Sequence, residues 1–123
     1  MSDQFKERHP NGDVPIVRLQ QRVDEWIRTV GVDYFDPLTN TVILAEEVGE
    51  VARIIARRYG QQSEKEGDRG HDLGEELSDV IFVVCCLANQ TGTDLAAAFD
   101  RKMDRRTERD QERHARNPKL RRD

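Results

Sequence analysis

Two short acidic motifs interrupt helical patterns that are otherwise apolar in this chain of 123 residues. Residues three or four apart share one face of an α-helix, so Glu47 lies beside Glu50, and Glu76 lies beside Asp79. The other residues on these two faces are apolar, namely Ile43, Ile54, Val83 and Cys86. Any fold of this chain therefore has to bring several carboxylates to the edge of its core.

Desolvating several ionised carboxylates together raises their pKa values strongly, unless a cation keeps them charged. Mg²⁺ is a hard ion that takes oxygen ligands, and Mn²⁺ can replace it. Two packed helices that each present an acidic pair can place four carboxylates around one or two such ions. The sequence therefore predicts a metal site at Glu47, Glu50, Glu76 and Asp79. Ions of this kind bind phosphate oxygens and activate water, which Glu46 could orient or deprotonate as a general base.

Three other interpretations of the acidic residues are open at this point. The acids could be surface positions paired with Arg53, Arg57 or Arg58, although two matched clusters within apolar faces favour a site. A di-iron carboxylate bundle requires Glu-x-x-His, and none of the three histidines has a Glu three residues before it. A non-catalytic helical oligomerisation module would explain the apolar segments but not the aligned acids.

Helical periodicity and stop signals divide the chain into four helices without a convincing strand. The expected segments are 16–30, 37–59, 71–91 and a last helix that begins after a Thr93 cap and ends before Asn117. Asp36 and Pro37 are a strong helix start, and Gly31, Gly60 and Gly92 are expected stops. We expect an all-α four-helix bundle with one domain at 16–116, between a mobile arm at 1–15 and a basic tail at 117–123.

The apolar positions of the first two helices predict the core. In the first helix they are Ile16, Leu19, Val23, Trp26, Ile27 and Val30. In the second they are Leu44, Val48, Val51, Ile55 and Tyr59. An aromatic residue on such a face is usually a packing residue, so packing is favoured over base stacking for Trp26.

The third helix contains nine consecutive apolar residues at 80–88. A helix that is apolar all round has to be buried all round, which four helices of one chain achieve with difficulty. We therefore expect this segment to pack against a second copy in a homo-oligomer. Cys85 and Cys86 lie within it and are expected to be buried, reduced thiols.

The net charge of −4 conceals an asymmetry. Residues 101–123 contain ten Lys or Arg and five acids, so that this segment carries +5 and the first hundred residues carry −9. A basic segment beside an acidic centre suits an anionic ligand held through a metal, although a solvated helix face would look the same. Without an apolar leader or an apolar run of about 20 residues, the chain is expected to be cytoplasmic and not to contact a membrane.

The acidic pattern resembles that of a known family. The family pattern begins with two adjacent Glu and a third Glu three residues after the second. After a linker it continues with a Glu and, three residues later, an Asp. In this chain these positions are Glu46, Glu47, Glu50, Glu76 and Asp79. This double motif looks like the MazG-like branch of the all-α nucleoside triphosphate pyrophosphohydrolases, which are related to dimeric dUTPases and dCTP pyrophosphatases. The resemblance covers roughly 19–109.

The resemblance implies Mg²⁺-dependent hydrolysis of a nucleoside triphosphate to the monophosphate and pyrophosphate, in nucleotide-pool house-cleaning. It implies no nucleic acid polymer as a partner. Asn40 is similar to a base- or sugar-contacting position, and Trp26 and Phe35 to aromatic residues of the base pocket. Lys102 matches a phosphate-contacting lysine, after which relatives often carry an asparagine; here Arg105 and Arg106 follow. Lys102, Arg105 and Arg109 are accordingly the predicted phosphate-binding residues of the basic segment.

Overall fold

The computed structural model describes residues 12–63 and 70–120, and these form helices without strands. The helices are α2 (Ile16–Thr29), α3 (Pro37–Tyr59), α4 (Leu73–Gln90), α5 (Leu95–Ala115) and the short 3-10 helix η2 (Pro118–Leu120). This confirms the all-α prediction of four main helices. Most of the predicted N-terminal arm, the centre of the loop after α3 and the last three residues of the predicted tail lie outside the described residues.

Local signals in the sequence determine where α3 begins and ends. The Asp36 side chain caps α3 by accepting a hydrogen bond of 2.8 Å from the Thr39 backbone nitrogen, and Pro37 opens the first turn. Gly60 follows the last residue of the helix. Both predicted ends of this helix are therefore confirmed.

The turn between α4 and α5 was predicted correctly only in part. Gly92 follows α4 with φ 65°, a left-handed conformation that glycine adopts without strain. The cap of α5 is Asp94, whose carboxylate accepts from the Ala97 backbone nitrogen at 3.1 Å. The predicted cap, Thr93, instead shares a hydrogen bond with the Thr91 hydroxyl. The predicted cap was wrong by one residue, because α5 begins at Leu95 and the N-cap position is therefore Asp94.

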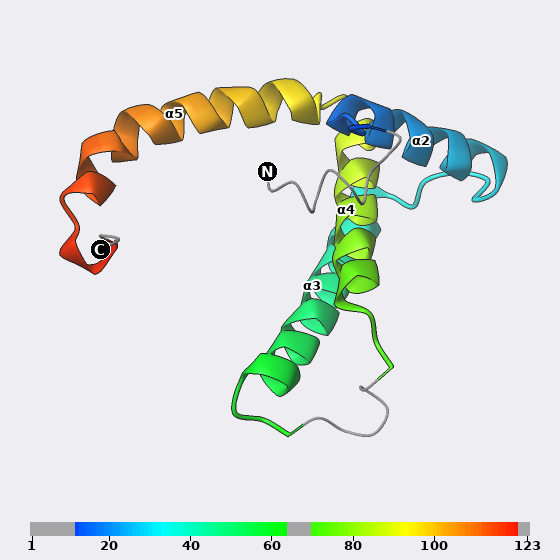
Figure 1. The fold of residues 1–123 in the computed structure, drawn as a ribbon. Helices are drawn as coiled ribbons and strands as arrows, with labels where there is room; N and C mark the ends of the chain where they lie inside the picture. Colours follow the sequence, from blue (N-terminus) through cyan, green and yellow to red (C-terminus); the bar gives the residue numbers. More distant parts are fainter. Residues whose placement is uncertain (1–11, 64–69, 121–123) are drawn as a thin grey trace.

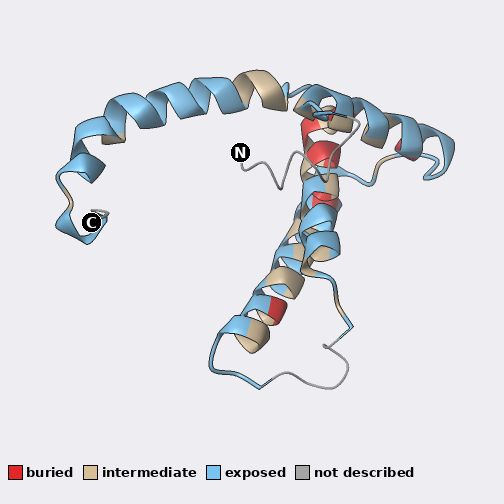
Figure 2. Ribbon diagram, viewed as in Figure 1, coloured by how far each residue is buried: buried red, intermediate tan, exposed pale blue. Residues whose placement is uncertain are grey.

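The helices α3 and α4 lie side by side and antiparallel, and α2 crosses the end of α4 (Figure 1). Helix α5 begins beside α2 and extends away from the α3–α4 pair (Figure 1). Within residues 12–63 and 70–120, four of the six buried apolar residues belong to α4, which is the centre of the core (Figure 2). The buried apolar residues are Ile27, Ile54, Val83, Cys85, Cys86 and Ala88.

The predicted core face of α3 was wrong in part. Val48, Ile55 and Tyr59 are exposed, and only Leu44 and Val51 of that stripe are half-buried. The helix is rotated so that the face carrying Glu47 and Ile54 turns toward α4. At the end of α2, Val30 is also exposed, and Trp26 is half exposed.

The apolar segment 80–88 is not buried all round within one chain, because Ile81 remains exposed. Its packing against a second copy stays a prediction. None of the described helices is by itself long and apolar enough to span a membrane, and α4 and α5 meet that condition only as a pair bent by 104°.

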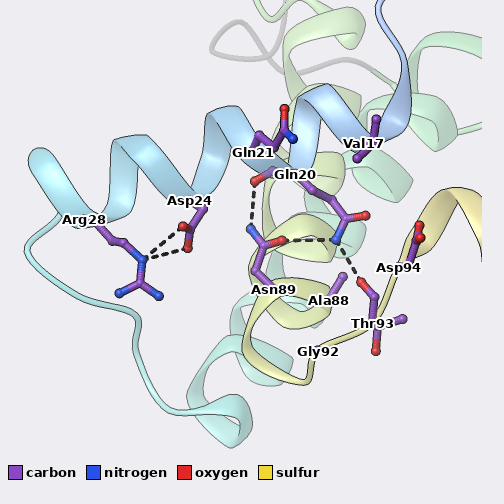
Figure 3. Close-up of a pocket in the computed structure, with 10 residues that line it drawn as sticks. All are labelled: Val17, Gln20, Gln21, Asp24, Arg28, Ala88, Asn89, Gly92, Thr93 and Asp94. Atoms are coloured by element: carbon purple, nitrogen blue, oxygen red, sulfur yellow. Dashed lines mark hydrogen bonds and ion pairs between the residues drawn. The ribbon is translucent and has the colours of Figure 1, made fainter.

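A polar network joins α2, α4 and α5 (Figure 3). Buried Gln20 donates to the Asn89 side chain at 3.1 Å and to the Thr93 carbonyl at 2.9 Å, and it accepts from the Leu95 backbone nitrogen at 3.0 Å. Asn89 in turn donates to the Gln20 carbonyl at 2.9 Å. These residues line an open depression of about 460 Å³. Since both side-chain groups of Gln20 are already engaged, we interpret the depression as a helix junction rather than a binding site.

Loss of the Gln20 side chain should destabilise this junction. Gln20→Ala leaves the Leu95 nitrogen and the Thr93 carbonyl without their partner, which costs about 1–3 kcal/mol of unfolding free energy. Gln21→Ala is the matched control, because Gln21 is the exposed neighbour and should change stability by less than about 0.5 kcal/mol. Urea denaturation measures both, and equal midpoints for the two variants would contradict the role of the network.

Candidate functional site

Three of the four predicted metal ligands converge between α3 and α4. Glu47 of α3 and Glu76 and Asp79 of α4 each offer a carboxylate oxygen, and these atoms lie within 4.8 Å of one another. Glu47 and Glu76 are half-buried, whereas Asp79 is exposed. The cluster therefore lies at the border between the interhelical core and solvent.

Ionising all the carboxylates of the cluster at once is electrostatically unfavourable. Burial raises the pKa of Glu47, and the neighbouring carboxylates of Asp79, Glu76, Glu50 and Glu46 raise it further, in that order. A bound cation would reverse this effect by stabilising the ionised form. The donors are carboxylate oxygens alone, without a thiolate or imidazole among them, which suits a hard divalent ion such as Mg²⁺ or Mn²⁺.

Glu50, the fourth predicted ligand, is not part of this group. Its carboxylate lies one turn beyond Glu47 and accepts a hydrogen bond of 2.8 Å from the Arg53 guanidinium. The interpretation of the acids as surface ion pairs therefore describes Glu50 in this structure. Glu46, the predicted general base, is an exposed neighbour of Glu47. A contact that the sequence did not suggest is that of His71, whose Nδ1 lies 3.1 Å from a Glu76 oxygen.

A cavity of about 340 Å³ opens directly beside the acidic cluster. Two rows of residues lead into it from the acids, one on each of the paired helices. On α3 the row is Glu47, Ile43 and Asn40, and on α4 it is Asp79, Val83 and Cys86. The remaining wall comes from the end of α2 and the loop that follows it. The site thus combines an anionic edge with a largely apolar interior.

The three residues predicted to contact a base or sugar all line this cavity. Trp26 and Phe35 contribute aromatic surface, and the Trp26 ring meets Phe82 edge to face with centroids 5.7 Å apart. Asn40 is buried, and its amide donates to the Gln90 side chain at 2.9 Å and to the Phe35 carbonyl at 3.3 Å. Asn40 is therefore held in place by α4 and by the loop. Trp26 therefore packs against Phe82, as was favoured for it, and base stacking by Trp26 stays a prediction.

The loop between α2 and α3 is anchored by Tyr34. Its hydroxyl donates to Asp24 at 2.6 Å and accepts from the Asn89 amide at 3.1 Å. Burial and the Asp24 carboxylate raise the pKa of Tyr34 to about 12, and the hydrogen bond from Tyr34 lowers the pKa of Asp24. Val32 has φ 73° in the same loop, a strained conformation for a β-branched residue. The cavity wall is therefore held by tertiary contacts.

The predicted phosphate-binding residues Lys102, Arg105 and Arg109 lie together on the exposed surface of α5. The structure does not bring them to the acidic cluster of the same chain, because α5 extends away from α3 and α4 (Figure 1). Arg109 is paired with Asp110 at 2.7 Å, and this guanidinium lowers the pKa of Asp110 to about 2.

Sequence reasoning missed several residues of the cavity, notably Asp33, Tyr34, Phe82 and Cys86. One signal was available, because Val83 and Cys86 follow Asp79 on the same face of α4. The contribution of the loop after α2 had no comparable signal, since it depends on how α2 crosses α4.

Known proteins are similar to this chain in sequence and fold. A family model of the MazG nucleotide pyrophosphohydrolase domain matches residues 35–114. The uncharacterized protein YpjD of Bacillus subtilis (strain 168) is 39% identical over 98 residues, which cover 80% of this chain and 88% of YpjD. The crystal structure of YPJD from Bacillus subtilis matches with a TM-score of 0.68 and 36% identity, over 76% of this chain and 94% of that one. A Bacillus-conserved MazG protein, a nucleotide pyrophosphohydrolase, matches with a TM-score of 0.63 and 34% identity, over 76% of this chain and 90% of that one.

Neutralising Glu47 should stabilise the metal-free protein at neutral pH. Because the pKa of Glu47 is raised by folding, its ionisation costs stability, which is lost as the pH rises through the folded pKa. In EDTA at pH 7, Glu47→Gln should therefore unfold at a higher urea concentration than wild type, and the difference should shrink toward pH 4. The exposed control Glu46→Gln should show a smaller gain. A Glu47→Gln variant that is less stable than wild type in EDTA would contradict the repulsion within the cluster.

Proposed function

The chain belongs to the MazG nucleotide pyrophosphohydrolase family, and on this basis we propose that it hydrolyses nucleoside triphosphates to the monophosphate and pyrophosphate with Mg²⁺. The observation that carries this proposal is the carboxylate cluster of Glu47, Glu76 and Asp79 at the edge of an apolar cavity of about 340 Å³. A nucleotide has the matching division, with a polyanionic phosphate chain at one end and a flat, largely apolar base at the other. We further propose a role in removing surplus or aberrant triphosphates in the cytoplasm.

Glu47, Glu76 and Asp79 are the proposed ligands, and Glu50 is the proposed fourth ligand once its carboxylate leaves Arg53. A divalent ion held there would supply charge neutralisation for the phosphates and a water of lowered pKa. Glu46 is the proposed base, because it is exposed beside Glu47 and can accept a proton from water at the mouth of the cavity. Its exposure also allows it to pass the proton to solvent.

The cavity is the proposed site of the nucleoside. Trp26 and Phe35 offer aromatic surface to a base, and Asn40 offers a fixed amide at the inner end. Cleavage of the bond between the α and β phosphates requires the α-phosphate, which is bonded to the sugar, to lie at the acids, and the cavity begins at Glu47 and Asp79. This arrangement supports cleavage between the α and β phosphates rather than loss of the terminal phosphate.

We also propose that the chain self-associates, as a dimer or tetramer, through one side of the α3–α4 pair. Leu44, Val48 and Ile55 follow one another at helical spacing on α3. On α4 the corresponding stripe is Leu77, Ile81 and Val84, and four of these six residues are exposed.

The spacing supports a single continuous surface. In each helix the stripe lies roughly a quarter of a turn from the residues that face the other helix. Because α3 and α4 run antiparallel, the same rotation in both helices leads to the same side of the pair (Figure 1). A second copy covering this side would complete the burial expected for the segment 80–88. It could also supply Lys102, Arg105 and Arg109 to the phosphates of a neighbouring site.

Activity should depend on the carboxylate cluster. Asp79→Asn should lower kcat/KM by about a hundredfold or more, because it removes a charged ligand, whereas the exposed control Glu75→Gln should stay within about twofold of wild type. The measurement is release of monophosphate and pyrophosphate from a panel of ribo- and deoxyribonucleotides with Mg²⁺, Mn²⁺ or EDTA. Diphosphate and phosphate as products would contradict the proposed bond. Absence of turnover with either metal would favour a non-catalytic module.

Self-association should be sensitive to charge on the proposed face. Val48→Asp should weaken it by about tenfold or more, because the new carboxylate would be desolvated in the interface. Val42→Asp is the matched control on the same helix, since Val42 is 54% exposed and Val48 50%, but Val42 lies outside the stripe. Sedimentation equilibrium gives the dissociation constants. A monomeric wild-type protein, or equal effects of the two substitutions, would overturn the proposal.

A further inference from the structure

The inner end of the cavity is formed by residues about two helical turns from the acidic cluster. On α4, Val83 and Cys86 follow Asp79 at four and seven residues, which puts Cys86 roughly 10 Å along the helix from Asp79. On α3, Asn40 lies seven residues before Glu47 in the opposite direction. Because the helices are antiparallel, Cys86 and Asn40 lie at the same end of the cavity. Both side chains are buried, whereas Asp79 at the acidic cluster is exposed.

Cys86 lines the cavity and Cys85 does not, so Cys85 is a matched control for substitutions at Cys86. The two thiols are neighbours in sequence and almost equally buried, with 3% and 1% of their surfaces exposed. Successive residues of a helix point about 100° apart, and only Cys86 lines the cavity. A change at either residue disturbs the core of α4. Only a change at Cys86 alters the space inside the cavity.

Cys86 is small and uncharged at its place in the cavity. Burial raises the pKa of its thiol to about 11, so the group is protonated at neutral pH and acts as a compact apolar surface with a weak S–H donor. Val83 of the same helix and Asn40 of α3 also line the cavity, and the Asn40 side chain meets α4 at Gln90, one turn beyond Cys86. Asn40 cannot easily retreat, since its amide is bonded to Gln90 and to the Phe35 carbonyl. A larger side chain at residue 86 would therefore occupy part of the cavity.

We propose that Cys86 is a specificity-determining residue, which sets the depth available to the nucleobase and so the size of base that the cavity accepts. This inference rests on the proposed function, because it takes the bound molecule to be a nucleotide with its phosphates at the acids. A side chain longer than cysteine shortens the cavity from its inner end. A purine extends further from the sugar than a pyrimidine, so it is affected first.

The test compares Cys86→Met and Cys86→Ala with Cys85→Met and Cys85→Ala. The chain has one tryptophan, and Trp26 lines the cavity, so its fluorescence reports binding of purine and pyrimidine nucleoside monophosphates without any turnover. The same proteins are then assayed for KM and kcat with the matching triphosphates and Mg²⁺. Thermal melts show whether each variant is folded.

We expect Cys86→Met to weaken purine nucleotide binding by about tenfold or more relative to pyrimidine, since a single methylene in an apolar pocket has effects of this order and Met is two heavy atoms longer than Cys. The loss should appear in KM more than in kcat, and Cys86→Ala should shift the ratio toward purines. Both Cys85 variants should leave the ratio within about twofold of wild type, even if they lower stability. If Cys86→Met fails to fold, the change in the purine-to-pyrimidine ratio of Cys86→Ala decides whether the proposal holds.

An unchanged purine-to-pyrimidine ratio in the Cys86 variants, or an equal change in the Cys85 variants, would overturn the role of Cys86. A wild-type protein that binds monophosphates in a size-dependent way at Cys86 but hydrolyses no triphosphate would contradict the proposed reaction and leave this inference standing. Wild-type turnover of triphosphates with no dependence on residue 86 would support the proposed reaction and contradict the role of Cys86.

Discussion

Mutual repulsion among the carboxylates between α3 and α4 is the constraint on which the rest of the structure depends. Glu47 faces Glu76 and Asp79 across the helix pair, and burial together with these charges raises its pKa. Such a contact opposes the packing of the two helices unless a cation occupies it. The same helices continue beyond the acids with apolar contacts, which keep the two segments together while the charged edge stays open to solvent.

The charged edge and the apolar interior belong to the same helix faces. From Glu47 and Asp79 the rows run inward through Ile43 and Val83, so one interhelical surface provides both an acidic rim and a cavity. If a divalent cation occupies the acidic rim, a molecule that is anionic at one end and apolar at the other matches this surface. Membership of the MazG family and this division of the surface support the same reaction class.

The third wall of the cavity depends on contacts far apart in the sequence. Gln20 and Asn89 bind α2 to the end of α4, and Tyr34 is held between Asp24 and Asn89. These hydrogen bonds position the loop after α2 against the α3–α4 pair. Buried polar side chains thus position an apolar cavity, because directional hydrogen bonds fix the crossing of α2 more narrowly than apolar packing does.

The sequence by itself determined what depends on neighbouring residues. The helix class, the Asp36–Pro37 start of α3, its end before Gly60 and the pairing of Glu76 with Asp79 follow from local capping and from 3.6-residue periodicity. The resemblance to a family grouped Trp26, Phe35 and Asn40, which line one cavity, and their contact with a nucleoside stays a prediction.

Only the tertiary structure decided how each helix is rotated about its axis. It turned Glu47 and Ile54 of α3 inward and left Val48, Ile55 and Tyr59 exposed, and it paired Glu50 with Arg53. It also directed α5 away from the acids, so that Lys102 lies apart from them in one chain. Periodicity shows which residues share a face, but several faces of α3 are partly apolar. The choice among them depends on the summed burial against α2 and α4, which local sequence does not contain.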